Sequence, residues 1–195
     1  MKRTKPRKRS LLVVVAFLVA ATVLGLLIFQ KYRSSRELPV TRPEPRPTGM
    51  FRVTLFFATP DAEGLAREGR EVGACDNLPG CVQEVVGELV NGPVGELQPT
   101  LPPSAVVRGV RIEGDTAVID FGKELVAGLP GGSSAEMAAV YSVVDTVCLN
   151  FPQIKGVRFL VEGKGVDTLV GHLDLRQPLA PDYTLEQNDE KVVKP

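Results

Sequence analysis

The hydrophobic pattern of the chain opens with one long apolar run, residues 11–29, which contains no charged side chain. A helix rises 1.5 Å per residue, so the run would form a helix of roughly 28 Å, close to the hydrocarbon thickness of a bilayer. Six basic residues precede the run and three follow it closely, and an excess of positive charge marks the cytoplasmic side. We therefore predict a single-pass helix in the cytoplasmic (inner) membrane, limited by Leu11 and Phe29, with residues 1–10 in the cytoplasm and the rest exported.

Two other interpretations of this run stay open. A cleaved signal peptide normally has an apolar region of about 7–15 residues before a small-x-small site. Here bulky apolar side chains continue to Phe29, and Gln30-Lys31 follows directly. A helix of a soluble protein is the second alternative. A lipoprotein anchor is not favoured, because no cysteine ends the run.

Residues 30–49 form a proline-rich linker, and its four prolines are Pro39, Pro43, Pro45 and Pro47. Proline blocks helices and favours an extended polyproline II chain, so the last sixteen of these residues would hold the next domain up to about 50 Å from the membrane. We interpret the segment as a connector, with a docking site for a proline-binding partner as the alternative. At the other end, residues 184–195 are polar and aperiodic, which predicts a disordered tail.

Residues 50–183 have the patterns of one folded domain. A β-branched and aromatic stretch predicts a strand over 52–58, ended by Pro60-Asp61. Apolar residues at three- and four-residue spacing predict a helix over 82–90, closed by Asn91-Gly92-Pro93. Residues 106–113 and 116–121 then predict a hairpin around Gly114-Asp115.

The second half of the domain begins with a helix. Ser133 and Glu136 have the spacing of a capping box. The apolar stripe that follows is Met137, Val140, Tyr141, Val144, Val147, Cys148 and Phe151. Strands are expected at 157–161 and, after a glycine turn, at 166–170. The predicted order is β-α-β-β-α-β, an α+β fold with two helices on one face of a sheet, because each helix has an apolar stripe to bury.

The net charge of the chain is zero because two parts of opposite charge cancel. Residues 1–46 hold 11 basic and two acidic side chains, a net charge of +9, whereas residues 47–195 hold 12 basic and 21 acidic ones, a net charge of −9. An acidic domain repels phosphates, so we expect no nucleic-acid partner. One His, three Cys and no Trp leave little material for a metal or redox centre, and we expect no metal and no cofactor.

Several short motifs of the domain resemble the GerMN domain, the sporulation and spore germination family of bacterial envelope proteins. They are Val53–Phe57, Gly92-Pro93, Leu101-Pro102, Val118–Phe121, Gly132-Ser133 before a helix with Tyr141, Val157–Gly163 and Thr168–Asp174. The resemblance covers about residues 51–180. It implies a compact module similar to the ring-building motifs of envelope-spanning complexes. It also implies an adhesive or assembly role with no established enzymatic activity.

The cysteines offer a candidate disulfide between Cys75 and Cys81. They flank a short loop before the first helix, and an exported domain lies where disulfides persist. Cys148 lies on the apolar stripe of the second helix and is interpreted as a buried small hydrophobe. Free thiols, another pairing or a metal site remain the alternatives.

A hydrolase could start only from His172 with Asp174, because His172 is the single histidine. A triad also needs a serine in reach, and no candidate serine lies in a nucleophile-elbow sequence. These candidates are Ser104, Ser133, Ser134 and Ser142. The glycine-rich loop before Ser133 could cradle an anion but lacks the Lys-Ser/Thr of a phosphate loop. Asp120 and Asp145 are expected to face solvent or cap backbone groups.

These patterns predict no catalytic, cofactor or metal site. We expect a membrane-anchored, exported, non-catalytic interaction module of the bacterial cell envelope. Its partners would be membrane lipid, through the anchor, and an envelope protein or a second copy of itself. The alternatives are an envelope hydrolase and a sensor that binds a small ligand or glycan.

Overall fold

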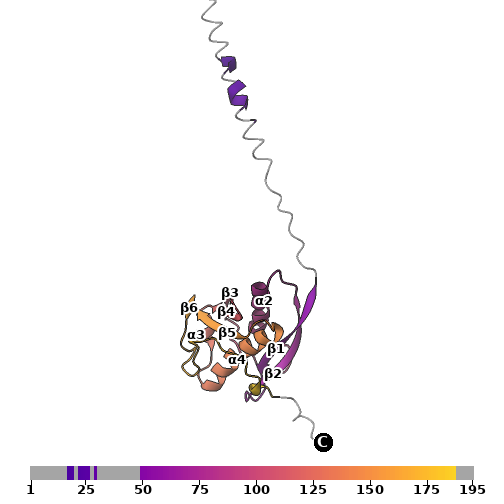
Figure 1. Cartoon of the computed structure of the whole chain (residues 1–195), viewed down its shortest axis with the longest axis vertical. Helices are drawn as coiled ribbons and strands as arrows, with labels where there is room; N and C mark the ends of the chain where they lie inside the picture. Colours follow the sequence, from indigo (N-terminus) through magenta and orange to yellow (C-terminus); the bar gives the residue numbers. More distant parts are fainter. Residues whose placement is uncertain (1–16, 20–21, 27–28, 30–48, 188–195) are drawn as a thin grey trace, which may run out of the picture. The chain divides into compact units, whose positions relative to one another are not determined.

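The computed structural model describes residues 17–19, 22–26, 29 and 49–187 (Figure 1). The chain divides into two units, residues 1–44 and 45–195, and the described residues of the first unit are helical. Among the described residues, no helix is both long and apolar enough to cross a membrane. The predicted span from Leu11 to Phe29 is described only in part, at residues 17–19, 22–26 and 29. Residues 1–10, nearly all of the linker and residues 188–195 lie outside the described residues.

The second unit contains six strands and four helical segments in its described part. The strands are β1 (Met50–Ala58), β2 (Leu65–Gly73), β3 (Val107–Glu113), β4 (Thr116–Phe121), β5 (Gly156–Val161) and β6 (Lys164–Gly165). The helices are α2 (Leu78–Asn91), α3 (Glu124–Gly128), α4 (Ser133–Asn150) and the short 3-10 helix η1 (Tyr183–Leu185). This mixed composition confirms the predicted α+β class.

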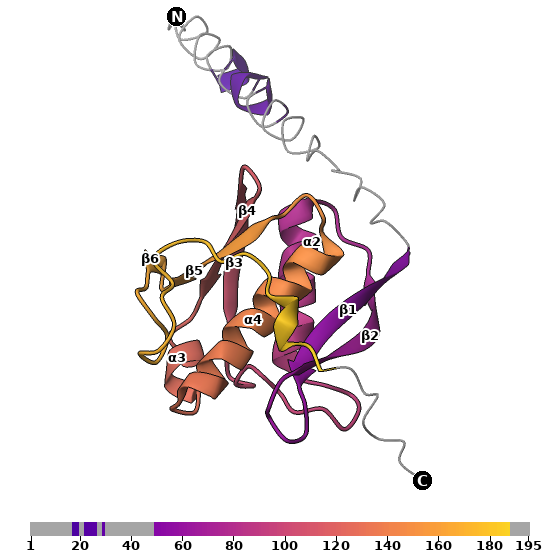
Figure 2. The same cartoon turned by 60° about the horizontal axis from the view of Figure 1, so that its bottom comes forward.

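The strands form two sheets with the long helices between them. β1 and β2 form an antiparallel two-stranded ribbon, and the other sheet has the order β3-β4-β5-β6, with β4 and β5 parallel. α2 packs against β3 and β1, while α4 packs against β1 and β5. Figure 2 shows the resulting layers, with α2 and α4 between the ribbon on one side and β3–β5 on the other.

Helix α2 begins and ends where its sequence favours it. The Asn77 side chain caps the helix by accepting the Gly80 N–H at 2.9 Å, and Pro79 lies in the first turn, where its missing N–H is tolerated. Gly92 ends the helix with a φ of 82°, a left-handed conformation that glycine adopts without strain. The predicted C-terminus is therefore confirmed, while the helix starts four residues before the expected position.

Helix α4 is buried on nearly all sides, not along one stripe. Besides the apolar stripe, Ala139, Ser142, Val143, Asp145 and Thr146 are buried. A helix without a polar face is typical of a position inside a core. α4 has this position because the ribbon covers one side of the helix and the four-stranded sheet covers the other.

The prediction of a single sheet is wrong, because strand β2 was not expected. β2 mixes charged residues with Gly69 and Gly73 and has no clear alternation of apolar and polar positions. β1 pairs with β2 in register from Met50↔Gly73 to Ala58↔Leu65, so the first strand lies in a ribbon of its own. The expected hairpin is confirmed, with Ile112 opposite Ala117 and Glu113 opposite Thr116.

The end of the domain also differs from the prediction. Residues 166–170 form no strand, since β6 ends at Gly165. Residues 184–187, expected in the tail, belong to the fold. The Gln187 N–H donates to the Leu65 carbonyl at 2.8 Å, and η1 lies directly before this contact.

The outer edge of β1 is covered by side chains of α4. The Asn150 amide accepts the Thr54 N–H at 2.9 Å and donates to the Thr54 carbonyl at 2.7 Å. The Thr146 hydroxyl accepts the Phe56 N–H at 3.0 Å. At the end of the strand, Ala58 exchanges two backbone hydrogen bonds with Gln98. A helix therefore supplies the hydrogen bonds that a third strand would have made.

We predict that Asn150→Ala lowers the free energy of unfolding by about 1–3 kcal/mol, because it leaves the Thr54 N–H and carbonyl without partners. Urea unfolding measures this change. Asn91→Ala is the matched control, since Asn91 at the end of α2 donates only to Glu88 at 3.2 Å and is exposed. Its effect should be about 0.5 kcal/mol or less. Equal effects of the two substitutions would show that α4 does not hold the edge of β1.

Candidate functional site

The outer edge of β2 carries backbone groups that no described residue pairs. Thr54 and Phe56 of β1 direct their N–H groups to α4, so the alternate residues of β1 exchange hydrogen bonds with β2. The residues of β2 that lie between the bonded ones, Arg67, Gly69 and Glu71, therefore direct their N–H and C=O groups away from β1. Such an edge is a template for another strand.

The other strand edges of the described domain are occupied or interrupted. The edge of β5 is covered by β6 and by a bridge between Val157 and Leu179. The edge strand β3 carries a register irregularity between Val107 and Gly109, and a β-bulge is one device that blunts an edge. β2 has a continuous register over nine residues, and only its Leu65 end is covered, by Glu186 and Gln187.

The face of β2 that lies toward α2 is fixed by Arg70. Its guanidinium donates to Glu68, to the Glu88 carboxylate at 2.9 Å and to the Gly92 carbonyl at 3.0 Å. Burial lowers the pKa of Arg70, but the hydrogen bonds with Glu88 and Glu68 outweigh it, so the pKa is raised. Glu68 also accepts the Val94 N–H at 3.0 Å. Side chains on one face of β2 therefore attach the strand to the end of α2 and the loop after it.

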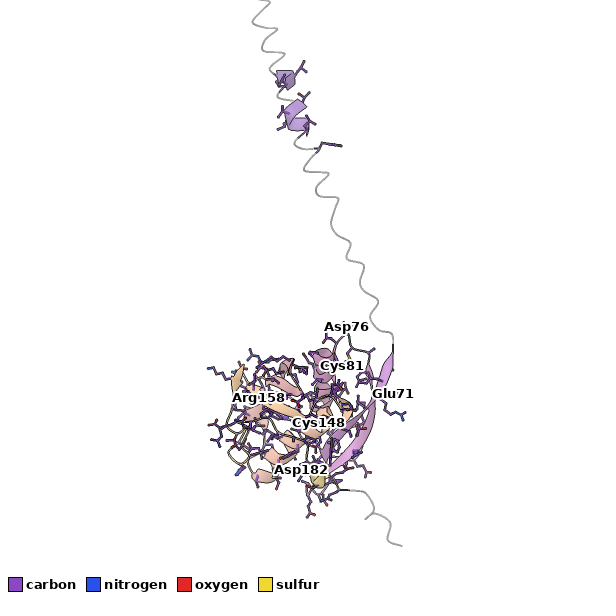
Figure 3. The ribbon with its side chains drawn as sticks, in the orientation of Figure 1. Glu71, Asp76, Cys81, Cys148, Arg158 and Asp182 are labelled. Carbon is purple, nitrogen blue, oxygen red and sulfur yellow. A yellow bond between two sulfur atoms is a disulfide. The ribbon has the colours of Figure 1, made fainter. Side chains whose placement is uncertain are left out.

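The disulfide joins Cys75 to Cys81, with 5.1 Å between their Cα atoms. It spans the loop between the end of β2 and the first turn of α2, and this loop contains the cap residue Asn77. Figure 3 shows Cys81 and Asp76 at the start of α2, and Glu71 at the margin of the ribbon. Cys148 is free and buried in α4, and burial raises its pKa to about 11, which disfavours the thiolate.

Glu136 does not form the expected capping box. Gly132 precedes α4 as the cap residue with no side-chain cap, and Ser133 is the first helical residue. The Glu136 carboxylate is fully buried and accepts hydrogen bonds from the loop after β6. The donors are the Thr168 hydroxyl at 2.9 Å and the N–H groups of Leu169 at 2.7 Å, Val170 at 3.0 Å, His172 at 2.7 Å and Leu173 at 3.3 Å.

These donors decide the ionisation of Glu136. Burial alone would raise its pKa, but the N–H donors of Val170, His172 and Leu169 and the Thr168 hydroxyl hold the pKa below its ordinary value. The loop that was expected to be a strand is thus organised around one carboxylate. No local signal in the sequence marks this contact, because Glu136 and the loop lie more than thirty residues apart.

The candidate hydrolase pair is not assembled in the described domain. Asp174 is bound by Arg176, with Nε at 2.9 Å and Nη2 at 2.6 Å, and this interaction lowers the pKa of Asp174 to about 2. His172 lines a shallow hollow of about 280 Å³ with residues of its own loop and no serine. The backbone N–H of His172 donates to the Glu136 carboxylate at 2.7 Å, and this hydrogen bond positions the residue.

Two adjoining hollows of about 450 and 510 Å³ flank the start of α4. They share Ala62, Ser134 and Ala138, and the glycine-rich loop before Ser133 lines the larger one. Neither hollow is lined by a lysine or arginine. Small and mostly uncharged residues line both hollows, so neither offers a cationic side chain to the anion considered from the sequence.

Asp120 and Asp145 accept hydrogen bonds from backbone N–H groups, which is one of the two roles expected for them. Asp120 accepts the Gly163 N–H at 2.7 Å and Asp145 the Asp182 N–H at 2.9 Å. The second carboxylate oxygen of Asp145, Oδ2, is buried without a hydrogen-bond partner. Burial raises the pKa of Asp145 to about 6, and the nearby carboxylates of Asp182 and Glu186 contribute to the increase.

The sequence and the fold both match known proteins. A family model described as "Germane: Sporulation and spore germination" matches residues 54–167. The structure of a candidate lipoprotein from Clostridium perfringens is similar at 26% identity and a TM-score of 0.50, covering 72% of this chain and 95% of that one. The tandem GerMN domains of the sporulation protein GerM from Bacillus subtilis are similar at 18% identity and a TM-score of 0.57, covering 68% and 46%. No curated protein sequence matches the chain.

We predict that Glu136→Gln lowers the free energy of unfolding at pH 7 by about 3 kcal/mol or more, because charge-assisted hydrogen bonds to the loop are lost. The folded-state pKa of Glu136 is lowered, so its stabilisation is present above the unfolded pKa of about 4.3 and is lost as the pH falls through the folded pKa. Unfolding between about pH 3 and 7 measures both effects. Glu84→Gln, at an exposed position of α2, is the control. An equal loss in both variants would contradict the role of Glu136.

The pH dependence of stability expected from Asp145 has the opposite sign to that from Glu136. Its pKa is raised to about 6, so the ionised carboxylate opposes folding, and stability falls as the pH rises from about 4 to 6. We predict that Asp145→Asn, which keeps an acceptor for the Asp182 N–H, raises stability above about pH 6 by about 1–3 kcal/mol. The gain should disappear near pH 4, about the unfolded pKa. Asp115→Asn in the exposed hairpin turn should show no such pH dependence, and a pH-independent effect of Asp145→Asn would refute the assignment.

Proposed function

The chain belongs to the sporulation and spore germination family, and we propose that it is a non-catalytic assembly module of the bacterial cell envelope, anchored in the cytoplasmic membrane and displayed outside the cytoplasm. The family model matches more than half of the chain and includes the ribbon from Thr54 onward. The observation that carries the proposal is the open edge of β2.

The support for the anchor comes from the sequence. The uncharged length of the apolar run and the six basic residues before it favour a single span with the N-terminus in the cytoplasm. The similar protein from Clostridium perfringens is described as a candidate lipoprotein. A lipid on that protein and an apolar helix on this chain would be two ways to hold a related domain at a membrane.

A docking role suits the surface of the domain better than a catalytic one. His172 is positioned by its backbone, its sequence neighbour Asp174 is bound to Arg176, and the hollow beside them is shallow. In contrast, Arg67, Gly69 and Glu71 are all exposed on a continuous strand. Strand addition at such an edge uses the backbone of both partners and needs no deep pocket.

We predict that a cysteine introduced by Ser35→Cys is labelled by a membrane-impermeant maleimide in intact cells, whereas one introduced by Ser10→Cys is labelled only after lysis. The two substitutions introduce one thiol on either side of the proposed span. The unsubstituted chain is the control, because it shows any labelling of the buried free thiol of Cys148. Labelling of Ser10→Cys in intact cells, or recovery of the chain in the soluble fraction, would overturn the proposed topology.

Docking through β2 is tested by Gly69→Pro and crosslinking in intact cells. Proline removes an N–H that β1 does not use, and it is tolerated in edge strands for this reason. Crosslinked complexes should be lost while the thermal unfolding temperature stays near that of the parent. Unchanged complexes in a folded Gly69→Pro variant would contradict docking at this edge.

A further inference from the structure

The sequence of β2 is self-complementary when it is read against itself in the opposite direction. The strand reads Leu65-Ala-Arg-Glu-Gly-Arg-Glu-Val-Gly73. An antiparallel pairing centred on Gly69 places Arg67 opposite Glu71 and Glu68 opposite Arg70. Each pair occurs twice about the centre, so two such strands would present only opposite charges to each other.

We propose that the partner of the open edge is a second copy of this chain, which pairs antiparallel through β2 about a two-fold axis at Gly69. The inference rests on the proposed assembly function and names its partner. A two-fold pairing uses the same surface of both copies, so the surface has to be complementary to itself. The charge order of β2 meets this requirement.

The backbone N–H and C=O groups of β2 point in the direction that this pairing needs. Arg67, Gly69 and Glu71 direct their N–H and C=O groups away from β1, because Thr54 and Phe56 bond to α4. In an antiparallel pair, the residues that exchange hydrogen bonds stand opposite each other. With the axis at Gly69, Gly69 faces Gly69 of the other copy and each Arg67 faces a Glu71, so these three residues are bonded. The pairing ends there, because Gly73 would face Leu65, whose carbonyl already accepts the Gln187 N–H.

Other registers with the same backbone phase place like charges together. Moving the axis by one residue sets Glu68 against Glu68 or Arg70 against Arg70. Moving it by two residues sets Arg67 against Arg67 or Glu71 against Glu71. Like charges directly opposite each other destabilise a strand pair. The axis at Gly69 is therefore the register that the charges select.

Arg67, Gly69 and Glu71, the residues that would bond to the second strand, are exposed. A Cβ added to Gly69 or Gly73 would meet no atom within 4 Å. Glu71 is exposed, and its ion pair with Arg52 is a loose one of 3.8 Å. Arg67 is held by Glu186 at 2.8 Å and lies over the Phe56 ring at 5.3 Å, which positions it beside the edge. Glu68 and Arg70 stay bound to each other, and Arg70 also binds α2.

Proximity is tested with the full chain, in detergent and in membranes, by Gly69→Cys and a short bis-maleimide. The two cysteines would lie at the axis, so a crosslinked dimer is expected. Gly73→Cys is the matched control, because it lies on the same edge and its Cβ also has open space. In the proposed dimer, the two positions 73 would be about 27 Å apart. Equal crosslinking at both positions would overturn the register.

Charge exchange tests the partner itself. Glu71→Arg makes both outer charges of the strand positive, and Arg67→Glu makes both of them negative. Each variant alone should dimerise about tenfold more weakly or worse than the parent, measured by sedimentation of the full chain in detergent. An equal mixture should recover the dimer as a heterodimer. Glu113→Arg, with the same charge change on the edge strand β3, should dimerise like the parent.

The outcomes separate this inference from the proposed function. Recovery of the dimer in the mixture supports self-pairing, provided that both variants keep the parent's unfolding temperature. Should Arg67→Glu lose stability with its Glu186 contact, the Glu71→Arg variant and the cysteine pair still decide the question. A monomeric parent, or a dimer insensitive to Glu71→Arg, refutes self-pairing. If Gly69→Pro still abolishes complexes in cells in that case, docking at β2 stands with a different protein as partner.

Discussion

The structure of the domain depends on a helix that is buried on nearly all sides. α4 lies between the ribbon and the four-stranded sheet, so most of its polar side chains are buried and bind neighbouring segments. Glu136 binds the loop at 168–173, Thr146 and Asn150 bind the edge of β1, and Asp145 binds the segment at Asp182. The parts of the fold that no strand ladder holds are thus attached to one helix. Hydrogen bonds of this kind fix a single arrangement, because an unpaired buried group is costly.

The features of the fold that depend on local pattern could be predicted from the sequence. The apolar spacing of α2 and the glycine at its end, and the turn at Gly114-Asp115, each act within a few residues. β2 was missed because its charged residues and Gly69 carry no alternation, although β1, Pro60-Asp61 and Gly64 together have the form of a strand and a turn that a second strand would follow. The side chain of Glu136 has the spacing of a cap, yet its partners lie in a distant loop, and no local rule assigns them.

Site prediction from the sequence had the same limit. The proximity of Cys75 and Cys81 is local, and the structure joins them. His172 and Asp174 are also close in sequence, but Arg176 binds the carboxylate and Glu136 holds the histidine backbone, so closeness in sequence did not assemble a pair. The open edge of β2 could not be predicted at all, because it follows from which neighbours β1 has: α4 on one side leaves β2 alone on the other.

The covered edge of β1 limits how many strands can add to the ribbon. A two-stranded ribbon has two edges, and repeated addition of strands into a fibre requires both. In this ribbon Asn150, Thr146 and Gln98 already occupy one edge. Association through the ribbon therefore terminates after one addition. The same side chains that stabilise the core thus leave the ribbon one edge for pairing, which prevents ribbon-to-ribbon polymerisation.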